Sequence, residues 1–439
     1  MRRPPAPRLP RRAQTALWYL QRRRVEEEMS RRHRPLFRVH GGYGEIVFLN
    51  DPAAIKAVFT GDPDELHAGE FNMANDKFLL FLVGPHSLLN VDGGEHLAQR
   101  RLLLPPFHGE RLGAYREAMV EAAERSIAEW PLGEPFELRE RMQAITLEVI
   151  LRSVCGIEEP ERRDEFRRRA DSFLAAATTP PVIVQLLFPR LRGRLAAAAW
   201  QRYLDERRRL DDLLTEEIER HRAAPGEDVL SLLLAARRED GSPLTDKELR
   251  DQLMTLLAAG HETSANALAW TFDLLFHHRE VAARLDEEIA AGGNGDGEYL
   301  DAVVRECMRF RPTVPRVGRK VLRDMELCGY HVPAGSYLTV SILNLHRDPR
   351  LFERPERFEP ERFLRDDSPG TYTFVPFGGG VRRCIGASFA DVEIRTVLRT
   401  ILERTRLRPA RDEPEPMIER NTVMVPKHGV PAVLEERRL

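Results

Sequence analysis

One helix dominates what this chain can fold into. The stretch LTDKELRDQLMTLLAAGHETSANALAWTFDLLF, residues 244–276, opens with a capping-box pattern in which Thr245 and Glu248 satisfy each other's free backbone N–H groups. Apolar residues then recur on nearly every side of the helix until Phe276. A helix that is apolar all round is enclosed by protein, so the sequence predicts a large helical domain built around this segment.

The rest of the chain predicts a mainly helical fold with small β-sheets at its margin (α+β). Residues 111–222 repeat apolar positions at helical spacing among Glu and Arg. LFRVHGGYGEIVFL, residues 36–49, predicts a hairpin, and alternating strand character returns in residues 319–343. The C-terminal NTVMVPKHGVPAVLEE predicts another hairpin. Without a βαβ rhythm, we expect a single domain over residues 31–439.

Two segments stand apart from this pattern. Residues 1–30 begin with a basic arm, for which we expect partial disorder; weak contact with an anionic membrane surface is the alternative. Residues 177–193, ATTPPVIVQLLFPRLRG, hold three prolines and predict a loop between two helices, a candidate lid.

Composition removes several classes of function. Lys+Arg is 67 and Asp+Glu is 69, a net charge of -2, so nothing favours nucleic acid as a partner. Four scattered cysteines do not form a disulfide framework, and we expect a reducing cytoplasm. No run approaches the ~20 apolar residues that cross a bilayer, so no transmembrane segment is expected.

A lone cysteine follows three glycines in FVPFGGGVRRCIGASFADVEIRTVL, residues 374–398. Gly378, Gly379 and Gly380 allow a tight loop, and an amphipathic helix follows it. Cys384 therefore lies just before a helix N-terminus, where the macrodipole favours an anion such as a thiolate. A buried, inert cysteine in a turn fits these residues equally well.

The segment AGHETS, residues 259–264, is a poor choice for the interior of a buried helix. Irregularities of this kind often mark function. In the alternative interpretation, Glu262 faces solvent and the Thr263 hydroxyl bonds back to a carbonyl of its own helix.

Two charged pairs share helix faces elsewhere in the chain. Glu306 and Arg309 are three residues apart, and His96 and Arg100 are four apart. Taken alone, each pair is ordinary surface decoration, typically worth ~0–1 kcal/mol.

Together these motifs resemble those of the cytochrome P-450 monooxygenases. The family's cysteine-loop pattern, Phe-x-x-Gly-x-Arg/His-x-Cys-x-Gly, is filled by Phe377, Gly380, Arg382, Cys384 and Gly386. The resemblance runs from about Leu36 to the C-terminus, with the motifs in the family's order. It implies the cytochrome P-450 fold, a triangular helical domain with haem between the oxygen-binding helix and the helix after the cysteine loop.

The resemblance also implies how haem b is held. Cys384 is expected to be the axial thiolate ligand of the iron, and Phe377 to pack beside the proximal face. Arg382 is expected to pair with a haem propionate, as in the family. The remaining residues expected to contact haem are His96, Arg100, Arg319, Gly378, Gly386 and Ala259.

For oxygen chemistry, AGHETS matches the family's oxygen-binding motif, with Glu262 in the acidic position. Gly260 is expected to leave space for O2, Thr263 to hold oxygen or its accompanying water, and Glu262 to feed protons inward. A structural network of Glu306, Arg309 and Arg362 is expected to brace the cysteine loop.

The implied reaction inserts one oxygen atom of O2 into a lipophilic small molecule, by C–H hydroxylation or epoxidation. Electrons from NAD(P)H are expected to arrive through a separate ferredoxin with its reductase, or a flavodoxin-type donor. The candidate pocket residues are Phe78, Phe81, Leu82, Ala258, Val314, Val317 and Thr422.

Two rival functions remain open at this stage. One is a haem-thiolate peroxygenase or isomerase that needs no electrons, although such relatives tend to lose the acid–threonine pair that Glu262 and Thr263 supply. The other is a non-catalytic haem protein that senses or stores a ligand, which would need no proton relay.

Overall fold

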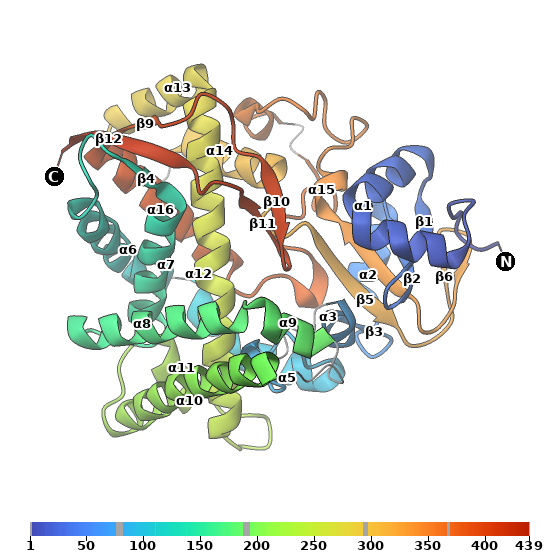
Figure 1. The fold of residues 1–439 in the computed structure, drawn as a ribbon, viewed down its shortest axis with the longest axis horizontal. Coiled ribbons are helices and arrows are strands. Elements are labelled where there is room, and N and C mark those ends of the chain that lie inside the picture. The colour runs from blue at the N-terminus through green and yellow to red at the C-terminus, as the bar shows by residue number, and fades with distance from the viewer. Residues whose placement is uncertain are drawn as a thin grey trace.

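The central helix α12 (Asp246–His277) organises the molecule. The computed structural model describes residues 2–75, 82–109, 111–187, 194–292, 297–366 and 369–438. Most of the other helices pack on one side of α12, and a mixed sheet lies with the N-terminal segments on the other side (Figure 1). The predicted fold class, mainly α with small sheets, is confirmed.

The start and the burial of α12 follow from its sequence. The Thr245 Oγ1 atom accepts the Glu248 N–H at 3.3 Å, and the Glu248 carboxylate accepts the Thr245 N–H at 2.8 Å, which confirms the predicted capping box. Leu253, Leu268 and Trp270 are fully buried on different faces. The helices beside or around it are α5 (Gly93–Leu103), α6 (Arg111–Ala128), α7 (Leu138–Ser153), α8 (Pro160–Ala177), α10 (Arg194–Ala223), α11 (Val229–Ala235), α13 (Arg279–Ala290), α14 (Glu298–Phe310) and α16 (Ala387–Arg404).

The principal sheet has the strand order β1-β2-β8-β5-β3. Its strands are β1 (Leu36–Gly41), β2 (Gly44–Leu49), β3 (Leu66–His67), β5 (Arg316–Val321) and β8 (Tyr337–Ser341), accompanied by α2 (Pro52–Phe59), α3 (Ala68–Asn75) and α15 (Ile342–Leu345). The predicted hairpin is confirmed, because Gly41 pairs with Gly44 across the turn. A second short hairpin joins β6 (Met325–Leu327) to β7 (Tyr330–Val332).

The basic N-terminal segment, for which the sequence predicts a partly disordered arm, forms helix α1 (Arg11–Arg32) in the structure. Trp18 is only 5% exposed and packs on Phe48 of β2, with ring centroids 5.8 Å apart. Glu26 is buried and accepts hydrogen bonds from Arg316 of β5. These contacts give the helix an anchored inner face.

The loop predicted for residues 177–193 is in part a helix, α9 (Pro180–Leu187). Pro180 and Pro181 occupy its first turn, where a missing backbone N–H removes no helical hydrogen bond. Two of the three prolines that suggested a loop therefore start a helix instead. Residues 188–193 lie outside the described part of the chain.

The predicted C-terminal hairpin is wrong. β11 (Val423–Pro426) pairs with β10 (Met417–Arg420), and β12 (Pro431–Arg437) pairs with β9 (Thr405–Pro409) and β4 (Pro135–Glu137). The turn lies earlier, at Asn421, which adopts φ 55, a region that Asn tolerates better than most residues. The two predicted strands therefore belong to different sheets.

None of the helices within the described residues is both long and apolar enough to cross a membrane.

Candidate active site

The cysteine loop rests on helix α2. Gly378 and Gly380 adopt φ 68 and φ 66, and a Cβ atom on Gly380 would lie 1.7 Å from the Phe59 carbonyl oxygen. A Cβ atom on Gly379 would meet the Phe59 ring at 2.2 Å. Only glycine combines these backbone angles with so close an approach, so the predicted tight loop is confirmed together with its physical cause.

The loop presents the Cys384 thiol just ahead of α16. The Cys384 N–H donates to the Phe377 carbonyl at 3.0 Å, which fixes the backbone at the sulfur-bearing residue. Burial raises the pKa of the Cys384 thiol, whereas the Gly386 N–H, Arg383 and Arg100 act to lower it. Cys384 nevertheless keeps an exposed face, so protein surrounds part of it and leaves the rest accessible. Two other cysteines, Cys155 and Cys307, are buried.

Four basic side chains from three separate segments converge near this loop. Burial and, to a smaller extent, the charges of Arg382, Arg100 and Arg319 together lower the pKa of His96 to about 3. The His96 Nδ1 atom is buried and has no hydrogen-bond partner among the described residues. Arg319 is 6% exposed, and burial and Arg382 lower its pKa to about 10.

This cluster fits the two carboxylates of haem. Asp92 pairs with Arg382, and Arg382 also donates to the Leu88 carbonyl at 3.1 Å. Arg319 donates to the backbone carbonyl of Gly318 at 2.7 Å, and its guanidinium forms no ion pair within the described residues. Buried arginines that repel one another are stabilised by anions, and bidentate pairing with a carboxylate suits them. The predicted propionate ligands are thus brought together.

Accessible space adjoins the middle of α12. Ala259 is exposed although α12 is otherwise mostly buried, and Ala258, Gly260, Glu262 and Thr263 are half-buried. The oxygen-binding motif expected from the sequence therefore lines an open face of the helix.

Gly260 has a packing reason to be glycine. A Cβ atom at this position would lie 2.8 Å from the Ile150 Cδ1 atom of α7. The Thr146 hydroxyl of α7 donates to the His261 carbonyl at 2.9 Å, which adds to this close contact. Any larger residue at 260 would displace the end of the Ile150 side chain, so the approach of α7 favours a small residue there, independently of any space for O2.

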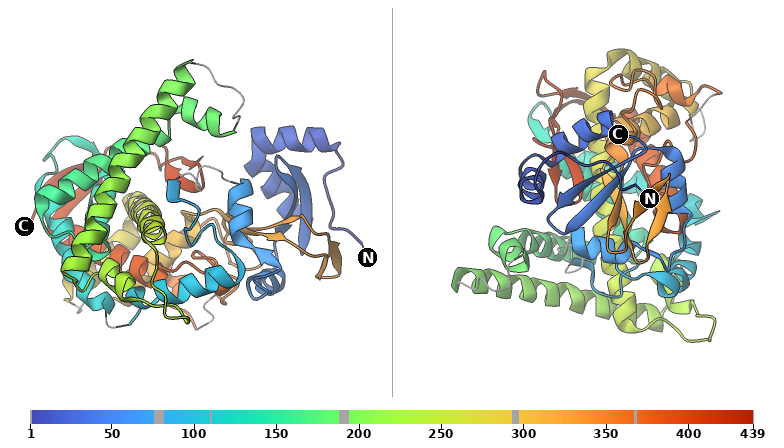
Figure 2. Two further views of the ribbon diagram at one scale, coloured as in Figure 1. Left: turned by 90° about the horizontal axis from the view of Figure 1, so that it is seen from below. Right: turned by 90° about the vertical axis from the view of Figure 1, so that its right-hand side faces the viewer.

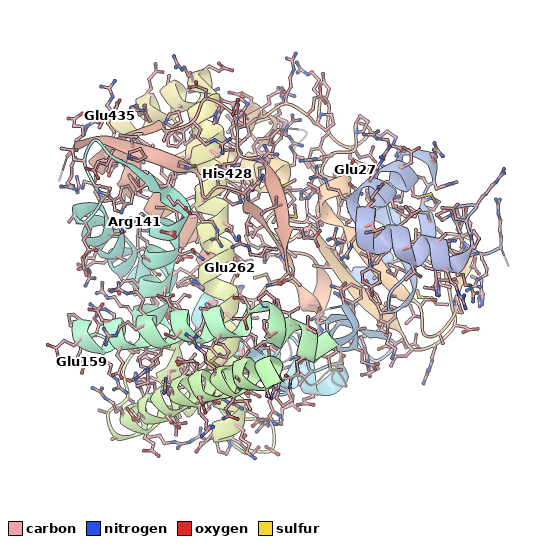
Figure 3. All side chains as sticks on the ribbon, in the orientation of Figure 1. Glu27, Arg141, Glu159, Glu262, His428 and Glu435 are labelled. Atoms are coloured by element: carbon pink, nitrogen blue, oxygen red, sulfur yellow. The ribbon has the colours of Figure 1, made fainter. Side chains whose placement is uncertain are left out.

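Thr263 and Glu262 show the geometry of the alternative interpretation. The Thr263 hydroxyl donates to the Ala259 carbonyl at 2.6 Å, and the Glu262 side chain is 34% exposed. Because the hydroxyl donates its hydrogen backward, its oxygen lone pairs stay available to accept a hydrogen bond from the open face. Figure 3 shows Glu262 midway along α12.

Arg139 is a site residue that the sequence reasoning missed. Its guanidinium contacts Glu262 at 3.1 Å and the Asn266 Oδ1 atom at 2.7 Å, one helical turn further along α12. The arginine is 11% exposed, and burial lowers its pKa while Glu262 raises it. No sequence signal links the two residues, since Arg139 belongs to an unremarkable Arg-Glu-Arg run at the start of α7.

The predicted structural network is present and buried. Glu306 and Arg309 form a bidentate pair at 2.7 and 2.8 Å, and Arg362 donates to Glu306 at 3.1 Å. Glu306 and Arg309 are fully buried, and Arg362 is 5% exposed.

A histidine that the sequence reasoning also missed connects this network to the cysteine loop. The backbone carbonyl of His346 accepts a hydrogen bond from the Arg309 guanidinium at 2.8 Å. The Nε2 atom of the His346 ring accepts one from the Val375 N–H at 3.0 Å. The chain Glu306–Arg309–His346–Val375 therefore leads from α14 to the start of the loop that carries Cys384.

Glu393 is a third residue that the sequence reasoning missed. It lies on α16 and is fully buried. Neither of its carboxyl oxygens has a hydrogen-bond partner among the described residues. Burial raises its pKa to about 8, and a weaker interaction with the Ser264 side chain of α12 acts in the opposite direction. The carboxyl group is therefore neutral at neutral pH.

The candidate pocket residues are only partly placed. Phe78 and Phe81 lie outside the described residues. Leu82 is buried, Ala258 and Val314 are half-buried, and Val317 packs against the core beneath the principal sheet. Thr422 lies half-buried in the turn between β10 and β11.

Comparisons with known proteins agree with this site. The family model "Cytochrome P450" matches residues 4–433. Cytochrome P450 135B1 of Mycobacterium tuberculosis is 39% identical over 441 residues, covering 97% of this chain and 90% of that protein. Cytochrome P450 135A1 of the same organism is 36% identical, covering 99% of this chain and 96% of that protein.

Solved structures share the fold. "Retinoic acid bound cyanobacterial CYP120A1" superposes with a TM-score of 0.83 at 24% identity, covering 99% of both chains. The heme domain of cytochrome P450DA gives a TM-score of 0.85 at 24% identity, covering 99% of this chain and 97% of that chain. The family match, the relatives and the fold lead to one conclusion: the chain belongs to the cytochrome P450 family of haem-thiolate monooxygenases.

Proposed function

We propose that this protein inserts one atom of O2 into a lipophilic small molecule, by C–H hydroxylation or epoxidation, with electrons from a separate redox protein. The observation that carries the proposal is the pairing of an accessible Cys384 thiol with the Glu262–Thr263 pair on the open face of α12. When bound, haem with a thiolate ligand supplies the oxygen chemistry, because the thiolate favours O–O cleavage.

In this proposal, the chain's residues hold the cofactor by charge and shape. Cys384 is the axial ligand, and the Gly386 N–H moderates the charge on its sulfur. Arg100, Arg319 and Arg382 neutralise the propionates, and the neutral His96 ring donates a hydrogen bond to one of them. The remaining contacts proposed for haem are Phe377, Gly378 and Ala259.

Thr263, Glu262 and Gly260 are the proposed catalytic residues. The Thr263 oxygen accepts a hydrogen bond on the open face of α12, and Glu262, being partly exposed, exchanges protons with solvent. Arg139 fixes the direction of the Glu262 carboxylate. The retained acid–threonine pair supports reductive oxygen activation over a peroxygenase or an isomerase, since such relatives tend to lose it. It also argues against a ligand sensor, which needs no proton relay.

Further observations bear on the substrate and on the electron donor. Four of the five described pocket candidates, Leu82, Ala258, Val314 and Val317, are apolar and the fifth is Thr422, a lining that suits a lipophilic substrate. Arg383 is exposed beside Cys384, which suits an acidic electron carrier such as a ferredoxin or flavodoxin. All four cysteines are free, in keeping with a reducing cytoplasm.

Two measurements test the proposal. Haem-replete protein should show the red-shifted Soret band of the reduced carbon monoxide complex, and Cys384→Ala should lose it. With NADH and a surrogate ferredoxin system, Thr263→Ala should keep that band but divert electrons to hydrogen peroxide, whereas Thr271→Ala, further along α12, should not. Turnover driven only by added hydroperoxide, or a colourless protein, would contradict the proposal.

A further inference from the structure

Helix α1 carries an exposed apolar pair that the active site does not use. Tyr19 is 73% exposed and Leu20 is 80% exposed, the highest values among the large apolar side chains of the described residues. The inner face of the same helix is anchored, since Trp18 and Met29 are only 5% and 6% exposed. Figures 1 and 2 show α1 on the outside of the principal sheet, at the periphery of the molecule.

The chain from its first residues up to the apolar pair and just beyond it carries charge of one sign. Residues 2–25 contain eight arginines and no acidic residue, and the first acid, Glu26, is buried beneath the helix. Some of these arginines are already paired: Arg3 with Glu45 and Arg23 with Glu27. Within the described part of the chain, no ion pair is formed by Arg8, Arg11, Arg12 and Arg24.

Four exposed residues share one side of α1. Arg12, Ala16, Tyr19 and Leu20 follow helical spacing and are all exposed. Gln21 departs from helical angles, and at this kink residues 20–24 line one shallow hollow together with Glu27, the partner of Arg23. Arginines therefore flank the apolar pair on both sides, along a helix that lies flat on the protein.

We propose that this face of α1 docks on the surface of a bilayer that contains anionic phospholipids. The arginines bind headgroup phosphates, while Tyr19 and Leu20 enter the boundary between headgroups and acyl chains. An acidic protein partner would satisfy the arginines but gives no role to two adjacent, almost fully exposed apolar side chains. The inference does not depend on the proposed function, because no residue of the haem site takes part.

Co-sedimentation of the haem-loaded, full-length protein with lipid vesicles tests the proposal. Binding to vesicles of phosphatidylcholine mixed with phosphatidylglycerol should be at least about tenfold tighter than to phosphatidylcholine alone, and should weaken in high salt. The double variant Tyr19→Ser, Leu20→Ser should lose about fivefold or more on the anionic vesicles at unchanged charge. The triple variant Arg11→Gln, Arg12→Gln, Arg24→Gln should lose the preference for anionic lipid.

Matched controls come from elsewhere on the surface. Leu132 precedes β4 by three residues and is 60% exposed, and Figure 1 shows β4 at the opposite end of the molecule from α1. Leu132→Ser should bind vesicles as the unaltered protein does. Arg208 of α10 is 69% exposed in its side chain, and Arg208→Gln should behave likewise. The Soret band of the reduced carbon monoxide complex confirms that each variant is folded around haem.

Three results would overturn the inference. The first is equal binding to both kinds of vesicle, or none to either. The second is salt-sensitive binding that the double variant Tyr19→Ser, Leu20→Ser leaves unchanged, since such binding would reflect general charge attraction only. The third is tight binding of an acidic electron carrier that needs the same arginines, combined with no vesicle binding, since it would assign the face to a protein.

Discussion

Replacing Glu393 by glutamine is expected to flatten the decline of stability with rising pH. Burial raises the pKa of this fully buried carboxyl group from 4.5 to about 8. Between those pH values, the native state holds a proton that the unfolded chain has released. Each pH unit in this window therefore lowers the free energy of unfolding by about 1.36 kcal/mol, and the decline ends above the native pKa.

The size of the effect is measurable. Between pH 5.5 and 8.5, the loss from this one group is about 3 kcal/mol. Since unfolding entropy is about 2.1 cal/mol/K per residue, 1 kcal/mol corresponds to roughly 1 °C in a chain of 439 residues. The Tm of the unaltered protein should therefore fall about 3 °C more than that of Glu393→Gln across this range.

The assay is thermal unfolding of haem-loaded protein, followed by circular dichroism at one fixed heating rate and at both pH values. The matched control is Glu403→Gln, which removes from the same helix a carboxylate that pairs with Arg399 at the surface. That variant should keep the full difference between the two pH values. Parallel curves for the unaltered protein and Glu393→Gln would refute the reasoning, because they would show that the buried carboxyl group does not titrate between the native and unfolded states.

Three further predictions concern the supports of the site. Glu306→Gln leaves two buried arginines without their carboxylate and should lower the free energy of unfolding by about 3–5 kcal/mol, with loss of haem on purification; full haem retention would contradict this. Gly380→Ala should prevent the thiolate Soret signature because its Cβ atom would overlap a backbone oxygen, whereas Gly370→Ala, with its nearest atom at 4.0 Å, should not. Arg139→Ala frees Glu262 and should lower the coupling of oxygen uptake to product several-fold while Arg139→Lys restores part of it; unchanged coupling would argue against a positioning role.

Local sequence patterns predicted the parts of the site that are local in the chain. The glycine loop around Cys384 and the capping box at Thr245 depend on neighbouring residues, and the structure confirms both. The pairing of Glu306 with Arg309 and Arg362 followed from the resemblance to a family. Helical periodicity likewise predicted the α12 core, because burial on all sides leaves a direct trace in composition.

Contacts between distant segments left no such trace. Arg139 meets Glu262 across 123 positions, and only the packing of α7 against α12 brings them together. His346 reaches Val375 through a ring nitrogen, and Glu393 reads as an ordinary polar position on an amphipathic helix. The loop predicted where α9 begins was wrong because the effect of proline depends on its position. Proline disrupts a helix interior but is tolerated in the first turn.

The seating of Gly380 on Phe59 has a consequence for protein engineering. The loop that carries Cys384 packs against α2, a helix more than three hundred positions earlier in the chain, directly after the first hairpin. Chimaeras that exchange N-terminal halves between relatives are therefore expected to displace Cys384 unless α2 and the glycine segment come from the same parent. Crossover points for recombination libraries belong where they keep these two pieces together.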